Sequence, residues 1–365
     1  MLKRILIISN TIDAGGAETF VMKVFRNLDR NEFVFDFIIN KLSSTFYLNE
    51  INELGGRVYY GVSKSVNPVK SFLSIKNLVN RNKYETVFCI AVHPLGFLDL
   101  LAARVGGARR CLIRSTNSQA GGFFSDVIAA CSRPLVRLLS DSMFSPSVEA
   151  AEWLFGRKHT ISGKVRLINN GVDINQFKYD EHLRVSARKK LGISENCIVV
   201  GHIGRFNFQK NHEMLLYIFS QLYALNNNSI LLLIGEGETK DKIINIANSI
   251  GIIDKIVFLG IRQDIPDLLN AFDVMIFPSF YEGMPNAIIE AQATDLPCVI
   301  SDTISRDVKI TDNVYFMSLA SDSKKWAEKA LSVSKQHRKD VSDVIIKSGY
   351  SISTTVNILT AEFEK

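Results

Sequence analysis

Short apolar runs recur along the chain, and each is followed by a turn and by a segment with apolar residues at helical spacing. The first run, residues 5–8, leads into a turn with two adjacent glycines and then into a segment whose apolar side carries Phe20, Val24 and Leu28. Continuous apolar runs are typical of strands that are buried on both faces of a parallel sheet. Further strands are predicted at residues 34–39, 57–60, 86–90, 110–114 and 165–168. Strands that alternate with helices predict an α/β fold with helices on both faces of the sheet.

The same pattern starts again in the second half of the chain. Strands are predicted there at residues 197–203, 229–234, 257–260, 273–277 and 297–301. A chain of 365 residues also exceeds the size at which a single core stops growing. We therefore expect two Rossmann-like, doubly wound parallel-sheet domains that face each other across a cleft and hold an anionic ligand between them.

The composition is that of an ordinary globular protein, with 47% apolar and 22% charged residues. The net charge of +6 and the pI of about 8.9 suit an anionic membrane surface or a nucleotide ligand, but the excess is too weak to indicate nucleic-acid binding. The five cysteines are scattered and show no Cys-x-x-Cys spacing, which fits a reducing cytoplasm.

Hydropathy predicts neither a membrane span nor an export signal. Nowhere do about 18 apolar residues follow one another. The apolar run near the N-terminus has only about five residues, which is shorter than the core of a signal peptide. We expect a cytoplasmic protein, and peripheral attachment to the inner face of the cytoplasmic membrane stays open.

The segment from Pro278 to Glu290 has the pattern of a ligand-binding strand, loop and helix. Pro285 suits the first turn of a helix, because its fixed φ and missing N–H are tolerated there. Asn286, Ala287 and Glu290 then share one helix face just past the N-terminus. Free backbone N–H groups at this position attract phosphate, and the Glu290 carboxylate can accept hydrogen bonds from ribose hydroxyls.

Two motifs resemble a known family. The first is Pro-Ser-x-x-Glu-Gly-x-x-x-x-x-x-Glu-Ala, which contains Glu282 and Glu290, and the second is Gly-Arg-x-x-x-x-Lys-Asn from Gly204 to Asn211. Together they resemble the retaining nucleotide-sugar glycosyltransferases of GT-B family 4, including bacterial capsular and exopolysaccharide enzymes. The resemblance implies an acceptor-binding domain at residues 1–169, to which a final helix at 351–365 returns, and a donor-binding domain at 170–350.

The resemblance also implies roles for individual residues. Arg205 and Lys210 would neutralise the leaving diphosphate, and Glu282 would position the diphosphate and the donor sugar. His93 follows a predicted strand, where a lone histidine is more often structural, but the resemblance makes it a fourth catalytic candidate. The expected donor-binding residues are Gly15, Gly16, Arg205, Lys210, Gly235, Ile261, Arg262, Glu282, Gly283, Met284, Pro285, Asn286, Ala287 and Glu290.

The glycine-rich turns bear on a different interpretation, that of an NAD-dependent oxidoreductase. Gly15 and Gly16 let backbone amides approach a diphosphate, but they lack the Gly-x-Gly-x-x-Gly spacing of dinucleotide sites. Gly235 and Gly237 have Lys240 where the third glycine would stand. Both turns therefore disfavour the oxidoreductase.

The remaining expectations concern substrates and metals. No two aspartates are two residues apart, so the Asp-x-Asp metal motif of the other major glycosyltransferase fold is missing, and we expect no metal and no cofactor beyond the nucleotide-sugar co-substrate. The resemblance implies a UDP-sugar donor and a lipid-linked or oligosaccharide acceptor in surface polysaccharide assembly. A non-catalytic or regulatory nucleotide-sugar binder of the same fold is the alternative.

A basic segment and two departures from the family complete the picture. Arginines near Phe123 and Phe124 suit contact with anionic lipid headgroups, and a helix with a solvated basic face fits equally well. These arginines are Arg104, Arg109, Arg110, Arg114, Arg133 and Arg137. Relatives often carry histidines where this chain has residues 114–117, so any role of those histidines near the donor sugar is here absent, altered or moved to Arg114, Thr116 or Asn117. They also carry a glycine-rich turn where this chain has residues 303–308.

Overall fold

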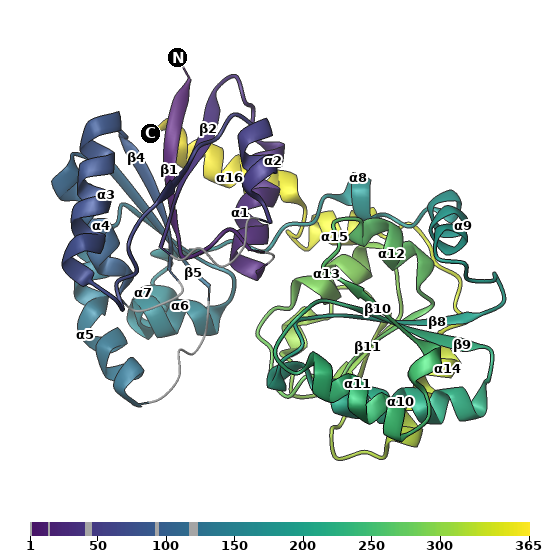
Figure 1. Ribbon diagram of the computed structural model, residues 1–365. Helices are drawn as coiled ribbons and strands as arrows, with labels where there is room; N and C mark the ends of the chain where they lie inside the picture. The colour runs from purple at the N-terminus through teal and green to yellow at the C-terminus, as the bar shows by residue number, and fades with distance from the viewer. Residues whose placement is uncertain (1, 14, 41–45, 92–94, 117–122) are drawn as a thin grey trace. The chain divides into compact units, whose positions relative to one another are not determined.

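The computed structural model describes residues 2–13, 15–40, 46–91, 95–116 and 123–365, with the side chains of 123–126 outside that description. The chain folds into two compact units (Figure 1). Unit 1 comprises residues 1–171 together with 350–365, and unit 2 comprises residues 172–349. Each unit is built around one parallel β-sheet.

The sheet of unit 1 has the strand order β3-β2-β1-β4-β5-β6-β7, and all of its neighbouring strands run parallel. The order reverses between β1 and β4, which makes this pair the topological switch point of the sheet. The strands are β1 Lys3–Ser9, β2 Phe33–Ile39, β3 Val58–Tyr60, β4 Thr86–Ala91, β5 Arg110–Ser115, β6 Ser142–Ser145 and β7 Val165–Leu167.

Helices cover both faces of this sheet. Ile5 and Ile7 of β1 pack in the core beneath the first and last helices, whereas Leu6 and Ile8 pack in the core beneath α3 and α4, as the two-residue period of a strand requires. The helices are α1 Gly16–Asn27, α2 Leu48–Glu53, α3 Pro68–Asn82, α4 Gly96–Gly106, α5 Phe123–Leu139, α6 Val148–Phe155, α7 Arg157–Ile161 and α16 Ile352–Glu364.

Helix α16 brings the end of the chain back to the first strands (Figure 1). Val356, Leu359 and Phe363 are buried in the core of unit 1, and the Phe363 ring contacts the rings of Phe33 and Phe35 with centroids 6.0 and 5.7 Å apart. The periodicity of residues 351–365 identifies these three positions as the apolar face.

The sheet of unit 2 has the order β10-β9-β8-β11-β12-β13, again parallel, with its switch point between β8 and β11. Its strands are β8 Ile198–Ile203, β9 Ser229–Ile234, β10 Ile256–Gly260, β11 Val274–Phe277, β12 Cys298–Ser301 and β13 Val314–Met317. Its α-helices are α8 Ile174–Phe177, α9 Glu181–Lys190, α10 His212–Leu225, α11 Lys240–Ser249, α12 Ile265–Ala271, α13 Asn286–Ala293, α14 Ser323–Val333 and α15 Ser342–Lys347. Its 3-10 turns are η1 Phe208–Lys210, η2 Ile253–Lys255 and η3 Arg306–Val308.

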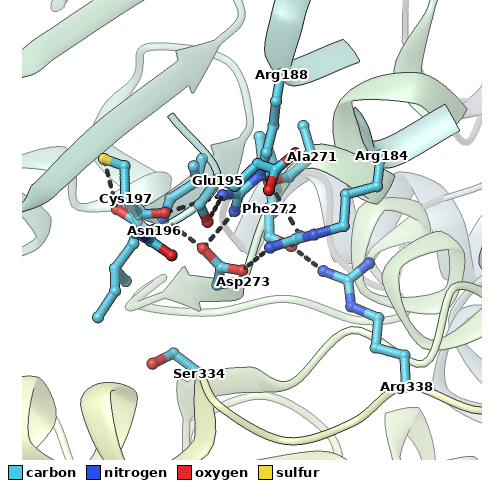
Figure 2. A network of polar contacts seen from close by, with 12 residues as sticks. Arg184, Arg188, Glu195, Asn196, Cys197, Ala271, Phe272, Asp273, Ser334 and Arg338 are labelled. Carbon is cyan, nitrogen blue, oxygen red and sulfur yellow. Dashed lines mark hydrogen bonds and ion pairs between the residues drawn. The ribbon is translucent and has the colours of Figure 1, made fainter. Parts of the chain in front are cut away.

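A buried charge cluster stabilises the amino edge of this sheet (Figure 2). Asp273, just before β11, accepts hydrogen bonds from Arg184 at 2.5 Å and Arg188 at 2.6 Å, both on α9. Together with Arg338, these arginines also donate to the carbonyl groups at the C-terminus of α12. Cations are favoured at the negative end of a helix dipole, so the cluster fixes α9 and α12 against the edge of the sheet that lies away from the ligand loops.

The α/β fold of two Rossmann-like parallel sheets is confirmed. Two strands were not predicted from the sequence, β6 Ser142–Ser145 and β13 Val314–Met317. Both are hard to recognise because they have only four residues each, and five of the eight side chains are not fully buried. No helix among the described residues is both long enough and apolar enough to cross a bilayer.

Candidate active site

The candidate site lies at the switch point of the unit 2 sheet. Strands β8 and β11 are parallel neighbours, so the loops that follow them leave from the same edge. These loops are residues 204–211, which contain the Gly-Arg-x-x-x-x-Lys-Asn motif, and 278–285, which contain the first part of the other motif, while its second glutamate, Glu290, lies on the helix that follows. Ligands of open α/β sheets bind at this edge, outside the carboxyl ends of the strands that flank the reversal in order.

A lysine–glutamate pair joins the two loops. The Lys210 Nζ donates to Glu282 Oε1 at 2.6 Å, and the side chains are only 15% and 10% exposed. The same ammonium lies 4.5 Å from the centroid of the Phe277 ring, which gives it a cation–π contact. Two of the four predicted catalytic residues therefore meet although 72 positions separate them in the sequence.

Backbone and side-chain hydrogen bonds hold the loops together around this pair. The Phe280 N–H donates to the Gln209 carbonyl at 2.9 Å, and the Gln209 amide donates to the Tyr281 carbonyl at 2.9 Å. The Asn211 amide donates to the Pro278 carbonyl at 3.1 Å. The Phe208 and Phe280 rings stack with centroids 4.7 Å apart. Because several bonds cross between the loops, the positions of Lys210 and Glu282 are fixed before any ligand binds.

Two glycines lie in tight contacts near Lys210, and at Gly235 the close approach of backbone requires a glycine. Gly235 follows β9 with φ of +137°, and a Cβ there would lie 2.1 Å from the Gly204 carbonyl oxygen. A Cβ on Gly204 would meet the Lys210 side chain at 3.1 Å. Gly235, a predicted donor-binding residue, thus has a structural reason to be glycine, which is to let the loop after β9 support the loop that carries Lys210.

Helix α13 begins beside Glu282. Pro285 is the N-cap of this helix, and no side chain caps its N-terminus. The first-turn amides around Asn286 and Ala287 therefore keep the arrangement that binds anions. Glu290 is 7% exposed on the same helix. A Cβ on Gly283 would meet nothing within 4 Å, so the side of this loop is open.

The other predicted donor residues of unit 2 differ in their partners. Arg205 is exposed, and within the described residues no carboxylate pairs with it. Arg262 donates to both oxygens of Asp264, at 2.8 and 2.6 Å, and this bond lowers the pKa of Asp264. Ile261, which follows β10, is 51% exposed. Arg205 is thus freer than Lys210, the other cation predicted to meet the diphosphate, which is paired with Glu282.

Two buried histidines lie behind Lys210, and sequence reasoning missed them. The His202 and His212 rings are in edge contact with centroids 4.7 Å apart, and the His212 ring stacks on Phe206 at 4.2 Å. His202 Nδ1 donates to the Ile276 carbonyl at 2.9 Å. Burial, together with the nearby Lys210 charge, lowers the pKa of His212 to about 4 and that of His202 well below its usual value. Both imidazoles are therefore neutral near pH 7 and add no charge to the site.

The predicted donor-binding glycines of unit 1 lie at the N-terminus of α1. Gly15 is the N-cap of α1 and Gly16 its first residue. A Cβ on Gly15 would lie 2.4 Å from Glu18 Oε2, so a carboxylate already stands at this helix N-terminus. A phosphate at that position requires the Glu18 side chain to move. His93 lies outside the described residues.

The basic segment of unit 1 is largely engaged within the chain. Arg114 is buried, contacts the Phe20 ring 3.6 Å from its centroid and donates to Asn170 at 2.6 Å, and burial lowers its pKa to about 9. Arg110 pairs with Glu362, and Arg133 donates to the Trp153 carbonyl. Arg114 is therefore part of the core and not of a basic surface, and Asn117 lies outside the described residues.

Cysteine, histidine and acidic side chains are the residues that could bind a metal ion. The five cysteines are all free thiols. In the described ranges, no three histidine, cysteine, aspartate or glutamate side chains gather closely enough to hold a metal ion.

Comparison with known proteins agrees with this geometry. Residues 184–350 match the family described as glycosyl transferases group 1. A Bacillus subtilis (strain 168) protein named as a glycosyltransferase, EpsF, is 30% identical over 98% of this chain and 95% of its own length. The chain belongs to the glycosyl transferases group 1 family. It is thus a glycosyltransferase, and the matched region contains both motifs of the unit 2 site.

A further relative and a solved structure of similar fold are informative. The Escherichia coli UDP-Gal:alpha-D-GlcNAc-diphosphoundecaprenol alpha-1,3-galactosyltransferase is 30% identical over 65% of this chain and 62% of its own length. The crystal structure of Anabaena HepE in complex with UDP-glucose has a TM-score of 0.78 at 16% identity and covers 99% of both chains, which shows a common GT-B fold.

The turn after β12, at residues 303–308, contacts the loop that carries Glu282. The Thr303 hydroxyl donates to the Ser279 carbonyl at 3.1 Å and lies 2.7 Å from the Ser301 hydroxyl. The turn therefore braces the loop that follows β11.

Proposed function

We propose that this glycosyltransferase transfers a sugar from a UDP-sugar to a saccharide on a lipid diphosphate carrier, with retention of the anomeric configuration, in the assembly of a bacterial surface polysaccharide. The observation that carries the proposal is the Lys210–Glu282 pair at the switch point, next to the uncapped N-terminus of α13. The E. coli relative, named for UDP-Gal and a GlcNAc-diphosphoundecaprenol acceptor, supports both substrate classes.

The leaving diphosphate would lie against positive groups from two elements. Arg205 is exposed and unpaired within the described residues, so its guanidinium can bind two phosphate oxygens. Lys210 adds a compact charge held in place by Glu282, and the first turn of α13 adds backbone N–H groups. Charge that accumulates on the diphosphate as the sugar leaves is stabilised by such preorganised groups.

The positions of Glu290, Ile261 and Arg262 suggest contacts with the nucleoside part of the donor. Glu290 on α13 would accept hydrogen bonds from the ribose hydroxyls, and the backbone at Ile261 and Arg262 would contact the base. Glu282 is engaged by Lys210, which suits a positioning group better than a free base. His93 and the loop at Gly15 and Gly16 remain candidates on the side of unit 1.

The proposed reaction needs no divalent metal. Arg205 and Lys210 supply the positive charge that a metal ion provides to the diphosphate in other transferases. Transfer rates would accordingly be the same with a chelator as with magnesium.

A lipid-linked acceptor also implies contact with an anionic membrane surface. Apolar side chains on the outer faces of α4 and α5 suit such contact better than the arginines, most of which bind groups of the chain itself. The exposed apolar residues are Leu101, Val105, Val127, Ile128, Leu135 and Leu138. Leu138→Glu should reduce cosedimentation with phosphatidylglycerol vesicles and leave UDP binding unchanged.

Calorimetric titration with UDP, GDP and ADP, in EDTA and then in magnesium, tests the donor site. We expect selective UDP binding that does not depend on the metal and that Glu290→Ala abolishes. Proton NMR of the product linkage, made from UDP-sugars and a short-chain lipid diphosphate carrying N-acetylglucosamine, tests retention and acceptor class.

The outcomes separate the alternatives. UDP binding without any product would favour a non-catalytic nucleotide-sugar binder. Binding that requires magnesium would contradict the metal-independent mechanism, and an inverted product would contradict retention. Transfer at an unchanged rate in Arg205→Ala or Lys210→Ala would refute the roles assigned to these cations.

A further inference from the structure

Backbone pairing between β8 and β11 stops short of the two loops of the candidate active site. The last paired residues are Gly201 and Met275, although β8 runs on to Ile203 and β11 to Phe277. Ligands of open α/β sheets bind just beyond the ends of the strands at a switch point. A group that joins the two strand ends beyond their last backbone pair therefore also helps to place the loops that follow them.

The imidazole of His202 makes such a connection. His202 is the residue after the last paired position of β8, and Ile276 is the residue after the last paired position of β11. The His202 Nδ1–H donates to the Ile276 carbonyl at 2.9 Å, and because a carbonyl oxygen only accepts, the proton of the neutral ring is on Nδ1. The residue is 0% exposed, so water does not compete for this bond. A side chain thus continues the link between the strands where their backbone pairing has ended.

The same imidazole also packs against the surroundings of Lys210. The His202 ring stacks on the Phe277 ring with centroids 5.1 Å apart, and the Lys210 ammonium lies 4.5 Å from the centroid of that same Phe277 ring. A Cβ on Gly204 would lie 3.0 Å from His202 Nε2 and 3.1 Å from Cδ and Cε of Lys210, so the imidazole and the lysine stem come close together beside this glycine. A shift of His202 would therefore be transmitted to Lys210.

We propose that His202 is a positioning residue of the transfer reaction, whose hydrogen bond to the Ile276 carbonyl fixes the spacing of the ends of β8 and β11 and thereby the place of Lys210. The inference rests on the proposed function, because it takes Lys210 to bind the diphosphate of the donor. His202 is fully buried, so it acts on the donor through Lys210 and not by contact. A phenylalanine would fill the same space but has no N–H to donate, which accounts for a histidine at this position.

Calorimetric titration with UDP tests the inference on the full-length protein, in EDTA, with four proteins. These are the wild type, His202→Phe, Lys210→Met and the double variant His202→Phe/Lys210→Met. His202→Phe keeps an aromatic ring but loses the donor, and we expect its Kd for UDP to be about 5- to 10-fold weaker than that of the wild type. In the Lys210→Met background the same change should leave Kd unaltered, because the ammonium that His202 places is absent.

His212→Phe is the matched control. His212 is also a buried imidazole, with its ring centroid 4.7 Å from that of His202, but both of its nitrogens lack a hydrogen-bond partner among the described residues. This variant loses no hydrogen bond and should bind UDP as the wild type does.

A second pair of variants decides the question if His202→Phe does not fold. The amide N–H of His202→Asn can take the place of Nδ1–H, whereas His202→Leu has nearly the same size and shape as asparagine but no donor. His202→Asn should therefore bind UDP about 5-fold more tightly than His202→Leu.

The outcomes distinguish this inference from the proposed function. Wild-type UDP affinity in His202→Phe, together with weaker binding by Lys210→Met, would overturn the inference and leave the proposed function intact. An equal loss on His202→Phe with and without Lys210 would also overturn it, because His202 would then act on the fold as a whole. Equal UDP affinity of Lys210→Met and the wild type would instead contradict the proposed role of Lys210, and the role of His202 with it.

Discussion

Breaking the Lys210–Glu282 pair should affect stability and catalysis in separable ways. At an Nζ–Oε1 distance of 2.6 Å, two unit charges attract with about 6 kcal/mol at an effective dielectric constant of about 20. Much of this attraction offsets the lost hydration of side chains that are only 15% and 10% exposed. Lys210→Met keeps the apolar stem but leaves Glu282 buried and unpaired, and this should lower the free energy of unfolding by about 3 kcal/mol.

The double variant Lys210→Met/Glu282→Gln separates the two effects. It contains no buried unpaired charge, so urea unfolding should recover about 2 kcal/mol relative to the single variant. UDP affinity should stay about 10- to 100-fold weaker in both variants, because neither has the ammonium that binds the diphosphate. The transfer rate should fall by a factor of about 10² to 10³ in both, as it does when one group that stabilises transition-state charge is removed.

Lys240→Met provides the control, because Lys240 pairs with Glu236 at 2.7 Å on the surface of the same unit, with side chains 27% and 44% exposed. Its loss should change stability by less than about 1 kcal/mol. The reasoning is refuted if Lys210→Met is as stable as Lys240→Met, since the buried pair would then carry no special cost. A wild-type transfer rate in Lys210→Met would refute the catalytic role.

Four further variants test other parts of unit 2. Gly283→Ala should fold normally, because nothing lies within 4 Å of the added Cβ, yet it should weaken UDP binding if the diphosphate approaches this loop. Gly235→Ala should not fold stably, since its Cβ would lie 2.1 Å from the Gly204 carbonyl oxygen. The folded pKa of His212, about 4, is below the unfolded value of 6.5, so the unfolded state binds more protons and stability should fall by about 3 kcal/mol as the pH drops from 6.5 to 4. His212→Phe should reduce this loss in urea titrations across that range, and an unchanged pH dependence would contradict the assignment. Asp273→Asn should lower the unfolding free energy by about 3 kcal/mol with unaltered UDP affinity in calorimetry, because the arginine cluster lies at the edge opposite the ligand loops.

The sequence predicts the elements of this site better than their contacts. The apolar run at 274–277 and the proline after it are sufficient to predict a buried strand that ends at a ligand loop. The contact between Lys210 and Glu282 is different, because it exists only if β8 and β11 are neighbours. Strand order depends on where the sheet reverses, and local periodicity carries no information about that.

Charged and polar residues in strands were the other source of error. Arg114 belongs to a run of arginines that is typical of a basic surface, yet its guanidinium lies on the Phe20 ring and binds Asn170. His202 lies in an apolar strand and was passed over, although it is buried behind Lys210 in contact with His212. Burial of a polar side chain depends on partners from distant segments, and these cannot be read from neighbouring positions.

A similar device occurs at the switch points of both sheets, where a lysine from one loop pairs with a carboxylate that lies close to the sheet edge. The pairs are Lys210–Glu282 in unit 2 and Lys64–Asp99 in unit 1. A lone buried charge is costly, so each pair keeps its charges in position before a ligand binds. The arrangement also limits affinity, because a diphosphate must compete with Glu282 for Lys210. Arg205, exposed and without a carboxylate partner among the described residues, faces no such competition and is therefore the cation expected to make the first contact with the donor.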